Sequence, residues 1–190
     1  MVNADGASAS GIDVEVLDQE PPAIATVNGT NNFTLDVPVW DQIVWYVEPS
    51  PGVFWGSVTP AVLTASVLEF YALSVDPDAL IAQWAAVSGL TLDVGKGIVA
   101  VSFDGAVGGE DVTLGASSTG PIAEVSTGVF GFVDTLPAAY PRLLLFFNVT
   151  PGTTTLSITA PGSRTCTPNA SVVNWPVFAR SVTHVGVRCD

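Results

Sequence analysis

The sequence predicts an all-β protein of two small antiparallel β-sandwich units joined by one short helix. Three observations support this class. Short apolar runs recur along the 190 residues and are separated by turns rich in Gly and Pro. Only Asp76–Ser88 has both the periodicity and the end signals of a helix. A weak internal repeat relates an early part of the chain to a late one.

Residues 1–11, MVNADGASASG, lack apolar periodicity and are expected to form a flexible N-terminal tail. Residues 12–75 are predicted to form the first sandwich unit. Its strand candidates are Ile12–Leu17, Ala23–Val27, Phe33–Val37, Ile43–Val47 and Val53–Val58. The apolar stretch Thr64–Val75 is also β-capable, but its pattern does not separate strand from helix.

Residues 76–89 predict the connecting helix. Asp76 is a suitable N-cap, Pro77 fits the first helical position, and Asp78 places a negative charge in the first turn. The stripe that this helix would bury consists of Leu80, Ile81, Trp84 and Val87, and Gly89 would end it.

Residues 90–190 are predicted to form the second sandwich unit. Its strand candidates are Gly97–Phe103, Asp111–Ala116, Ile122–Ser126, Val129–Val133, Leu143–Val149, Thr154–Ala160 and Ser181–Cys189. Pro151-Gly152 is interpreted as a turn between two adjacent strands. The repeat matches Phe33–Pro38 with Phe146–Pro151, and the strand after each proline has apolar residues at corresponding positions.

Charge and composition narrow the function classes. Eighteen acidic residues against five basic ones give a net charge of −13, which disfavours nucleic acid as a partner. Charged residues are only 12% of the chain, and a neutral polar surface suits an extracellular or cell-surface location. No apolar run has the length of a membrane span. The N-terminus lacks a signal-peptide pattern, so an export signal is presumed to have been removed; a cytosolic start is the alternative.

The only two cysteines are Cys166 and Cys189. An even pair in a chain that otherwise avoids cysteine favours a disulfide between them. Two buried free thiols are the alternative. A metal site is disfavoured because His184 is the single histidine and no C-x-x-C spacing occurs.

Two stretches carry a family resemblance. FNVTPGTTTLSITAPG resembles the turn-and-strand signature of carboxypeptidase-regulatory-like domains, and GIVAVSFDGAVGGEDVTLGAS is similar to that family's opening strand, loop and second strand. The resemblance covers residues 97–162 and, faintly, 12–58, and departs at an inserted LPAAYPR and at the Cys-containing C-terminal extension. It implies the transthyretin-like (prealbumin-like) sandwich, a fold used in this family by accessory, structural or adhesive modules of exported proteins.

Two groups of residues are candidate ligand sites. Trp40, Trp45, Tyr46 and Trp55 form the densest aromatic cluster, which would stack on sugars or form an interface if exposed; core packing is the alternative. Asp104, Glu110 and Asp111 crowd a Gly-rich loop and offer oxygen ligands for a weak calcium loop; a solvated acidic hairpin is the alternative.

No enzyme active site and no cofactor are predicted. His184 has no nucleophile motif to accompany it. The resemblance to transthyretin-like folds also brings in intradiol dioxygenases, whose iron is held by two Tyr and two His. This chain has a single histidine and so lacks the ligands for such an iron site. Related sandwiches contain a Lys–Asn isopeptide crosslink, and Lys96 is the single lysine that could form one here. Its place between two glycines instead predicts a solvated lysine.

The sequence therefore predicts a non-enzymatic, exported structural or adhesive protein that associates with copies of itself or with other envelope proteins, for example as a self-assembling cell-surface or filament subunit. One hypothesis is that residues from about Val2 to Val16 pair with, or lie across, an adjacent copy and so build a head-to-tail polymer. The alternative function is a carbohydrate-binding accessory module that uses the Trp40–Trp55 region. A hydrolase is a further alternative, but it would need a set of polar catalytic residues that the sequence does not show.

Overall fold

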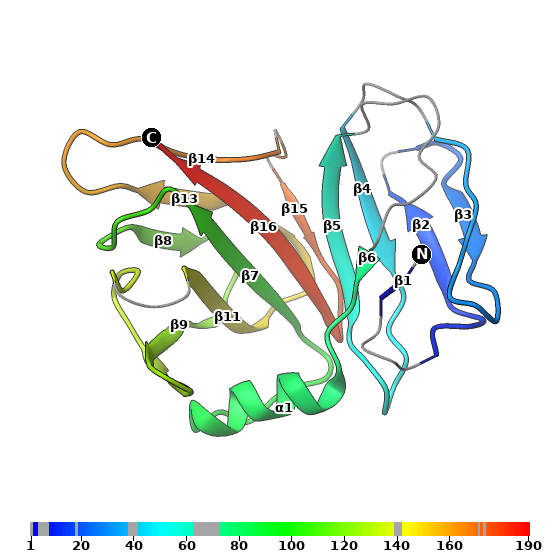
Figure 1. Ribbon diagram of the computed structural model, residues 1–190, viewed down its shortest axis with the longest axis horizontal. Helices are drawn as coiled ribbons and strands as arrows, with labels where there is room; N and C mark the ends of the chain where they lie inside the picture. The colour runs from blue at the N-terminus through cyan, green and yellow to red at the C-terminus, as the bar shows by residue number, and fades with distance from the viewer. Residues whose placement is uncertain are drawn as a thin grey trace. The chain divides into compact units, whose positions relative to one another are not determined.

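The computed structural model describes residues 2–3, 8–17, 19–37, 42–62, 73–138, 142–170, 172 and 174–190. These residues form short strands and one helix, α1 (Asp78–Val87), which confirms the all-β class (Figure 1). The chain divides into two compact units, Met1–Ile81 and Ala82–Asp190, with the division inside α1. Within the described residues, no helix has the length and apolar character that a bilayer span requires.

Unit 1 contains β1 (Val2–Asn3), β2 (Asp13–Val16), β3 (Ala23–Thr26), β4 (Gln42–Val47), β5 (Gly56–Val62) and β6 (Leu73–Ser74). Strands β3, β2, β4 and β5 are neighbours in that order, and every pair is antiparallel. Strands β1 and β6 form a short parallel pair. Side chains that alternate along β2 and β4, including Val14, Val16 and Trp45, lie in the core of this unit.

Two predictions for unit 1 change, and a third falls mostly outside the described residues. Phe33–Val37 is not a strand, although Phe33, Leu35 and Val37 alternate correctly and pack on the core. The strand predicted from Val53 begins instead at Gly56, because Ser50–Phe54 closes a turn through bonds from the amides of Val53 and Phe54 to the carbonyl of Ser50. Residues 64–72 of the ambiguous Thr64–Val75 stretch lie outside the described part of the chain.

The N-terminal segment is partly ordered by its own unit. Ala9 is fully buried in the core, and its amide donates to Oδ1 of Asn31 at 2.9 Å. Strand β2 is flanked by β3 and β4 on its two edges, so it has no free edge for a neighbouring copy. The ladder bonds of β2 are therefore made within the chain, and the hypothesis that Val2–Val16 pairs with, or lies across, an adjacent copy stays a prediction.

Helix α1 begins at Asp78, one residue after the predicted first helical position Pro77, and ends at Val87, one residue before the predicted end at Ser88. The carbonyl of Pro77, rather than that of Asp76, accepts the first helical bonds, from Leu80 and Ile81. At the other end, Gly89 has φ +68°, its amide bonds to Ala86, and the following amide bonds to Ala85, which is the Schellman pattern.

Only part of the predicted stripe on α1 is buried. Ile81 is fully buried, Leu80 and Trp84 are half-buried, and Val87 is exposed. Ala85 is buried in the place expected for Val87, so the buried face of the helix is rotated toward the smaller residue.

Within its described residues, unit 2 contains ten strands. They are β7 (Gly97–Asp104), β8 (Asp111–Leu114), β9 (Thr119–Ser126), β10 (Val129–Phe132), β11 (Leu143–Val149), β12 (Gly152–Thr154), β13 (Leu156–Thr159), β14 (Cys166–Pro168), β15 (Trp175–Val177) and β16 (Ser181–Cys189). The order β10-β9-β11-β7-β16 defines its main sheet, with β14 paired to β16. Strands β8 and β13 form one separate pair, and β12 and β15 another.

The main sheet of unit 2 is mixed rather than wholly antiparallel, because β16 runs parallel to β7. One face of this sheet shares a core with the separate strand pairs: Val99, Val101 and Val185 lie in the same cluster as Val112 of β8 and Trp175 of β15. The sandwich arrangement of each unit stays a prediction.

The predicted hairpin around Pro151-Gly152 is wrong. β11 pairs with β7 and β9, whereas the next strands, β12 and β13, pair with β15 and β8. The chain after Val149 therefore leaves the main sheet instead of turning back beside it. The internal repeat has no structural counterpart either, since Phe33–Val37 is irregular and Leu143–Val149 is a strand.

Candidate functional site

A groove in unit 2 is lined by residues of three consecutive strands, β8, β9 and β10. It has a volume of about 560 Å³ and is lined by Asp111–Thr113 of β8, Gly120 and Pro121 of β9, and Phe132–Asp134 at the end of β10. Within the described residues, β8 pairs only with β13 and β10 pairs only with β9. The groove is therefore bordered by two strands that each have an unpaired edge.

The lining of the groove is acidic and aromatic. Asp111 and Asp134 are exposed carboxylates, and the ring of Phe132 is 60% exposed. Among the lining residues there is no Lys, Arg, His, Cys or Ser, and Thr113 supplies the single hydroxyl. This set can hold an apolar or planar group against Phe132, and it contains no nucleophile paired with a base.

The β9–β10 hairpin beside the groove exposes apolar side chains. Val125 is 42% exposed and Val129 is 50% exposed, and with Phe132 they place three exposed apolar residues on one edge hairpin. The hairpin is fixed to its own unit by the contact between Phe130 and Trp84 of α1, whose ring centroids are 6.4 Å apart. The exposed residues thus lie on an anchored element rather than on a free loop.

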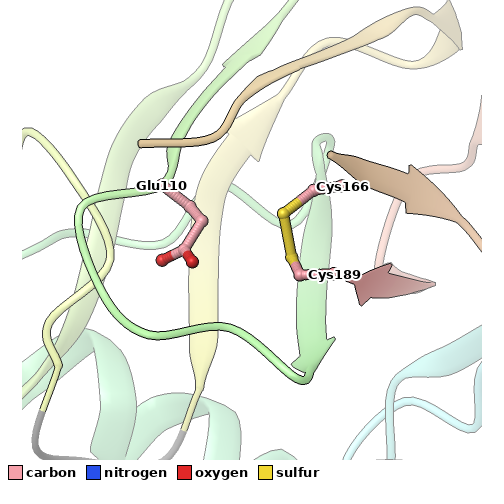
Figure 2. A group of neighbouring side chains, drawn as sticks. All are labelled: Glu110, Cys166 and Cys189. Atoms are coloured by element: carbon pink, nitrogen blue, oxygen red, sulfur yellow. A yellow bond between two sulfur atoms is a disulfide. The ribbon is translucent and has the colours of Figure 1, made fainter. Parts of the chain in front are cut away.

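The predicted disulfide is present. Cys166 at the start of β14 and Cys189 at the end of β16 are directly opposite in the antiparallel register, with an S–S distance of 1.99 Å (Figure 2). Asp190 extends the same pairing, because its amide donates to the carbonyl of Thr165 at 3.0 Å. The disulfide therefore links β16 to its antiparallel neighbour β14.

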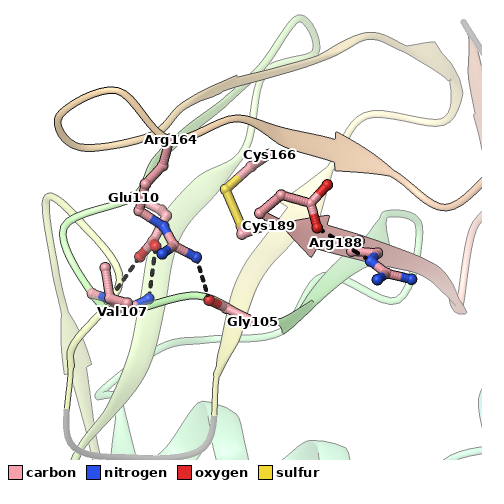
Figure 3. Close-up of a disulfide and its surroundings, with 9 residues drawn as sticks. Gly105, Val107, Glu110, Arg164, Cys166, Arg188 and Cys189 are labelled. Atoms are coloured by element: carbon pink, nitrogen blue, oxygen red, sulfur yellow. Dashed lines mark hydrogen bonds and ion pairs between the residues drawn. A yellow bond between two sulfur atoms is a disulfide. The ribbon is translucent and has the colours of Figure 1, made fainter.

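Glu110 is buried rather than solvated, which differs from the acidic-hairpin alternative, while calcium binding by this loop stays a prediction. Its side chain is fully buried, and its two carboxylate oxygens accept the amides of Val107 and Gly108, each at 2.9 Å (Figure 3). Asp104 and Asp111 are exposed and do not join it. Among the described residues, one group of three potential metal-ligand side chains has its ligand atoms within 4.8 Å of one another. This group is Glu110, Cys166 and Cys189.

The loop that carries Glu110 packs against the disulfided end of the chain. A Cβ added to Gly105 would overlap the backbone carbonyl oxygen of Cys189. Arg164 donates from its guanidinium to the carbonyl of Gly105 at 2.6 Å (Figure 3). Residues 105–110 therefore contact both the segment before Cys166 and the backbone of Cys189.

The aromatic cluster of unit 1 belongs to the core. Trp45 is 4% exposed and Trp55 is 3% exposed, and Phe33 meets Trp45 edge-to-face at 5.9 Å between ring centroids. Tyr46 is half-buried, and Trp40 lies outside the described residues. The two buried tryptophans have no open face on which a sugar could stack.

The remaining sequence candidates lie apart from the groove. His184 is half-buried in β16 between buried Thr183 and Val185. Lys96 lies in the turn before β7, and its Nζ donates to Oγ1 of Thr150 at 3.0 Å. The groove itself was not found from the sequence, because no local pattern shows that β8, which pairs with β13, lies beside the β9–β10 hairpin.

No family model matches this chain, and no curated protein matches it. The resemblance to carboxypeptidase-regulatory-like domains therefore stays a prediction.

Proposed function

We propose that this chain is an exported, non-enzymatic β-protein with a structural or adhesive role, which associates with copies of itself through the β9–β10 edge. The observation that carries the proposal is the apolar character of that edge: Val125, Val129 and Phe132 are exposed on the outermost hairpin of the sheet. Edge strands with exposed apolar side chains are usually covered, shortened or charged unless they form an interface.

The disulfide supports export. Disulfides persist in oxidising compartments and are rare where thiols are kept reduced. Other envelope proteins are the second class of partner, and the net charge of −13 argues against nucleic acid.

The test is the size of the protein in solution, measured for a matched pair of variants. Phe132→Asp places a charge on the hairpin edge and is expected to abolish association. Val94→Asp changes an equally exposed valine in the turn before β7 and is expected to leave association intact. A Phe132→Asp protein that assembles as the wild type does would contradict the proposal.

Carbohydrate binding stays a second candidate, but at the groove rather than at the tryptophans. The observation that favours it is the exposed ring of Phe132 in a hollow that also presents Asp111, Thr113 and Asp134. An aromatic face with nearby polar groups is the usual means of holding a sugar ring. Binding to a polysaccharide panel that is lost in Phe132→Ala and kept in Trp45→Phe would favour this function over self-association.

A further inference from the structure

A buried carboxylate lies beside the disulfide. Glu110 is fully buried, Cys189 is buried and Cys166 is half-buried, and one carboxylate oxygen and the two sulfurs lie within 4.8 Å of one another (Figure 2). The three residues come from separate parts of unit 2: Glu110 directly precedes β8, Cys166 begins β14 and Cys189 ends β16. The antiparallel pairing of β14 with β16 places the two cysteines opposite each other, and the loop before β8 brings Glu110 to them.

The carboxylate of Glu110 has a fixed orientation. Oε1 accepts the amide of Val107 and Oε2 accepts that of Gly108, each at 2.9 Å. A carboxylate oxygen has two lone pairs, so each oxygen keeps the capacity for a second partner. Hydrogen bonds of this kind orient the carboxylate ligands of metal sites.

We propose that reduction of the Cys166–Cys189 disulfide converts these three residues into a site for a divalent cation of the Zn²⁺ class. The ligands are the two thiolates and the carboxylate of Glu110, with water in the fourth position. Sulfur and carboxylate oxygen are both established zinc ligands, and three protein ligands with one open position form a common tetrahedral set. The proposal is independent of the proposed function.

The chemistry balances in two steps. A thiol reductant supplies two electrons and two protons to the S–S bond and is itself oxidised to a disulfide. The cation then displaces the two thiol protons and binds the two thiolates, while Glu110 binds as the carboxylate. In the oxidised chain the sulfurs are bonded to each other and no thiolate exists, so the site exists only after reduction.

Charge favours the cation over a metal-free dithiolate. Two thiolates and a carboxylate would place three negative charges in a buried region, which is costly without compensation. A divalent cation cancels two of these charges, so its binding and the deprotonation of the thiols favour each other.

The experiment titrates Co²⁺, a spectroscopic substitute for Zn²⁺, into protein that has been reduced and freed of reductant without air. We expect one Co²⁺ per chain, a thiolate-to-cobalt charge-transfer band, and displacement of the cobalt by Zn²⁺. The oxidised protein is the matched control and is expected to show no such band. Reduced protein without the band, reduced protein that has lost its fold by circular dichroism, or an equal band in oxidised protein would overturn the proposal.

A second set of variants tests the role of Glu110. Glu110→Gln is expected to weaken binding by about tenfold or more, since it replaces a charged ligand by a neutral amide. Asp111→Asn removes the neighbouring exposed carboxylate, which is not among the three ligands, and is expected to leave the affinity for Co²⁺ unchanged. If Glu110→Gln does not fold, the Cys166→Ser variant is titrated with Co²⁺ instead. Loss of the thiolate-to-cobalt band in this variant supports the proposed site, and a retained band overturns it. Equal affinity in wild type and a folded Glu110→Gln would also overturn it.

Discussion

Glu110 illustrates how burial changes the role of a charged residue. Carboxylates are rarely buried completely unless they are paired or hydrogen-bonded, and this one holds the amides of Val107 and Gly108. The loop from Gly105 to Glu110 is therefore folded around its own carboxylate. The sequence signal for this role is weak, because GGED is equally typical of a solvated acidic turn.

Glu110→Ala is expected to lower the free energy of unfolding by about 2–4 kcal/mol, because it leaves the part-buried amides of Val107 and Gly108 without their acceptor. Glu124→Ala is the control: Glu124 accepts a single amide, that of Gly128, at the surface, and its loss is expected to cost less than about 1 kcal/mol. Urea denaturation of the oxidised proteins measures both. Equal losses would contradict the structural role of Glu110.

Gly105 and Gly162 form a matched pair with similar backbones, φ +73° and +68°. A Cβ at Gly162 meets nothing within 4 Å, so Gly162→Ala is expected to cost about 1–2 kcal/mol from the left-handed conformation alone. A Cβ at Gly105 overlaps the carbonyl oxygen of Cys189, so Gly105→Ala is expected to cost at least about 3 kcal/mol. Thermal unfolding of the two variants tests this, and equal destabilisation would show that the loop does not pack on Cys189.

At the scale of elements, the disulfide joins β14 to β16 across 23 positions of sequence. Removing it with Cys166→Ser is expected to lower the free energy of unfolding by about 3 kcal/mol, because the unfolded chain gains freedom. A reductant should destabilise the wild type by a similar amount and leave the variant unchanged. Two reactive thiols in denatured, unreduced wild type would refute the bond itself.

Elements with strong local signals were predicted well from the sequence. Leu143–Val149 and Ser181–Cys189 have the predicted bounds, since long apolar runs with clear ends define them. Phe33–Val37 shows the limit of this reasoning: its side chains alternate toward the core, but strand pairing also needs a neighbouring backbone. β14 and β15 were missed because three residues that include a proline give no strand pattern.

The candidate site was less predictable because it depends on contacts between distant residues. The cysteine pair follows from composition, but its proximity to Glu110 depends on how β8, β14 and β16 come together. In the same way, the exposure of Phe132 and the burial of Trp45 are properties of the packed units, and a period-two pattern cannot distinguish an exposed face from a buried one.

At the scale of the whole molecule, charge and apolar surface act in opposite directions. A net charge of −13 makes copies of the chain repel each other, whereas the exposed hairpin residues Val125, Val129 and Phe132 favour contact. Salt screens the repulsion, with a Debye length that falls from about 30 Å at 0.01 M to about 10 Å at 0.1 M, and leaves apolar contact intact. Self-association is therefore expected to strengthen as salt is added.

Light scattering of the wild-type protein across a series of salt and protein concentrations tests the central claim most directly. Association through the β9–β10 edge predicts a mass that rises above that of the 19.6 kDa chain with concentration, and rises further with salt. A mass that stays at one chain under every condition, or an assembly that falls apart as salt is added, would contradict it.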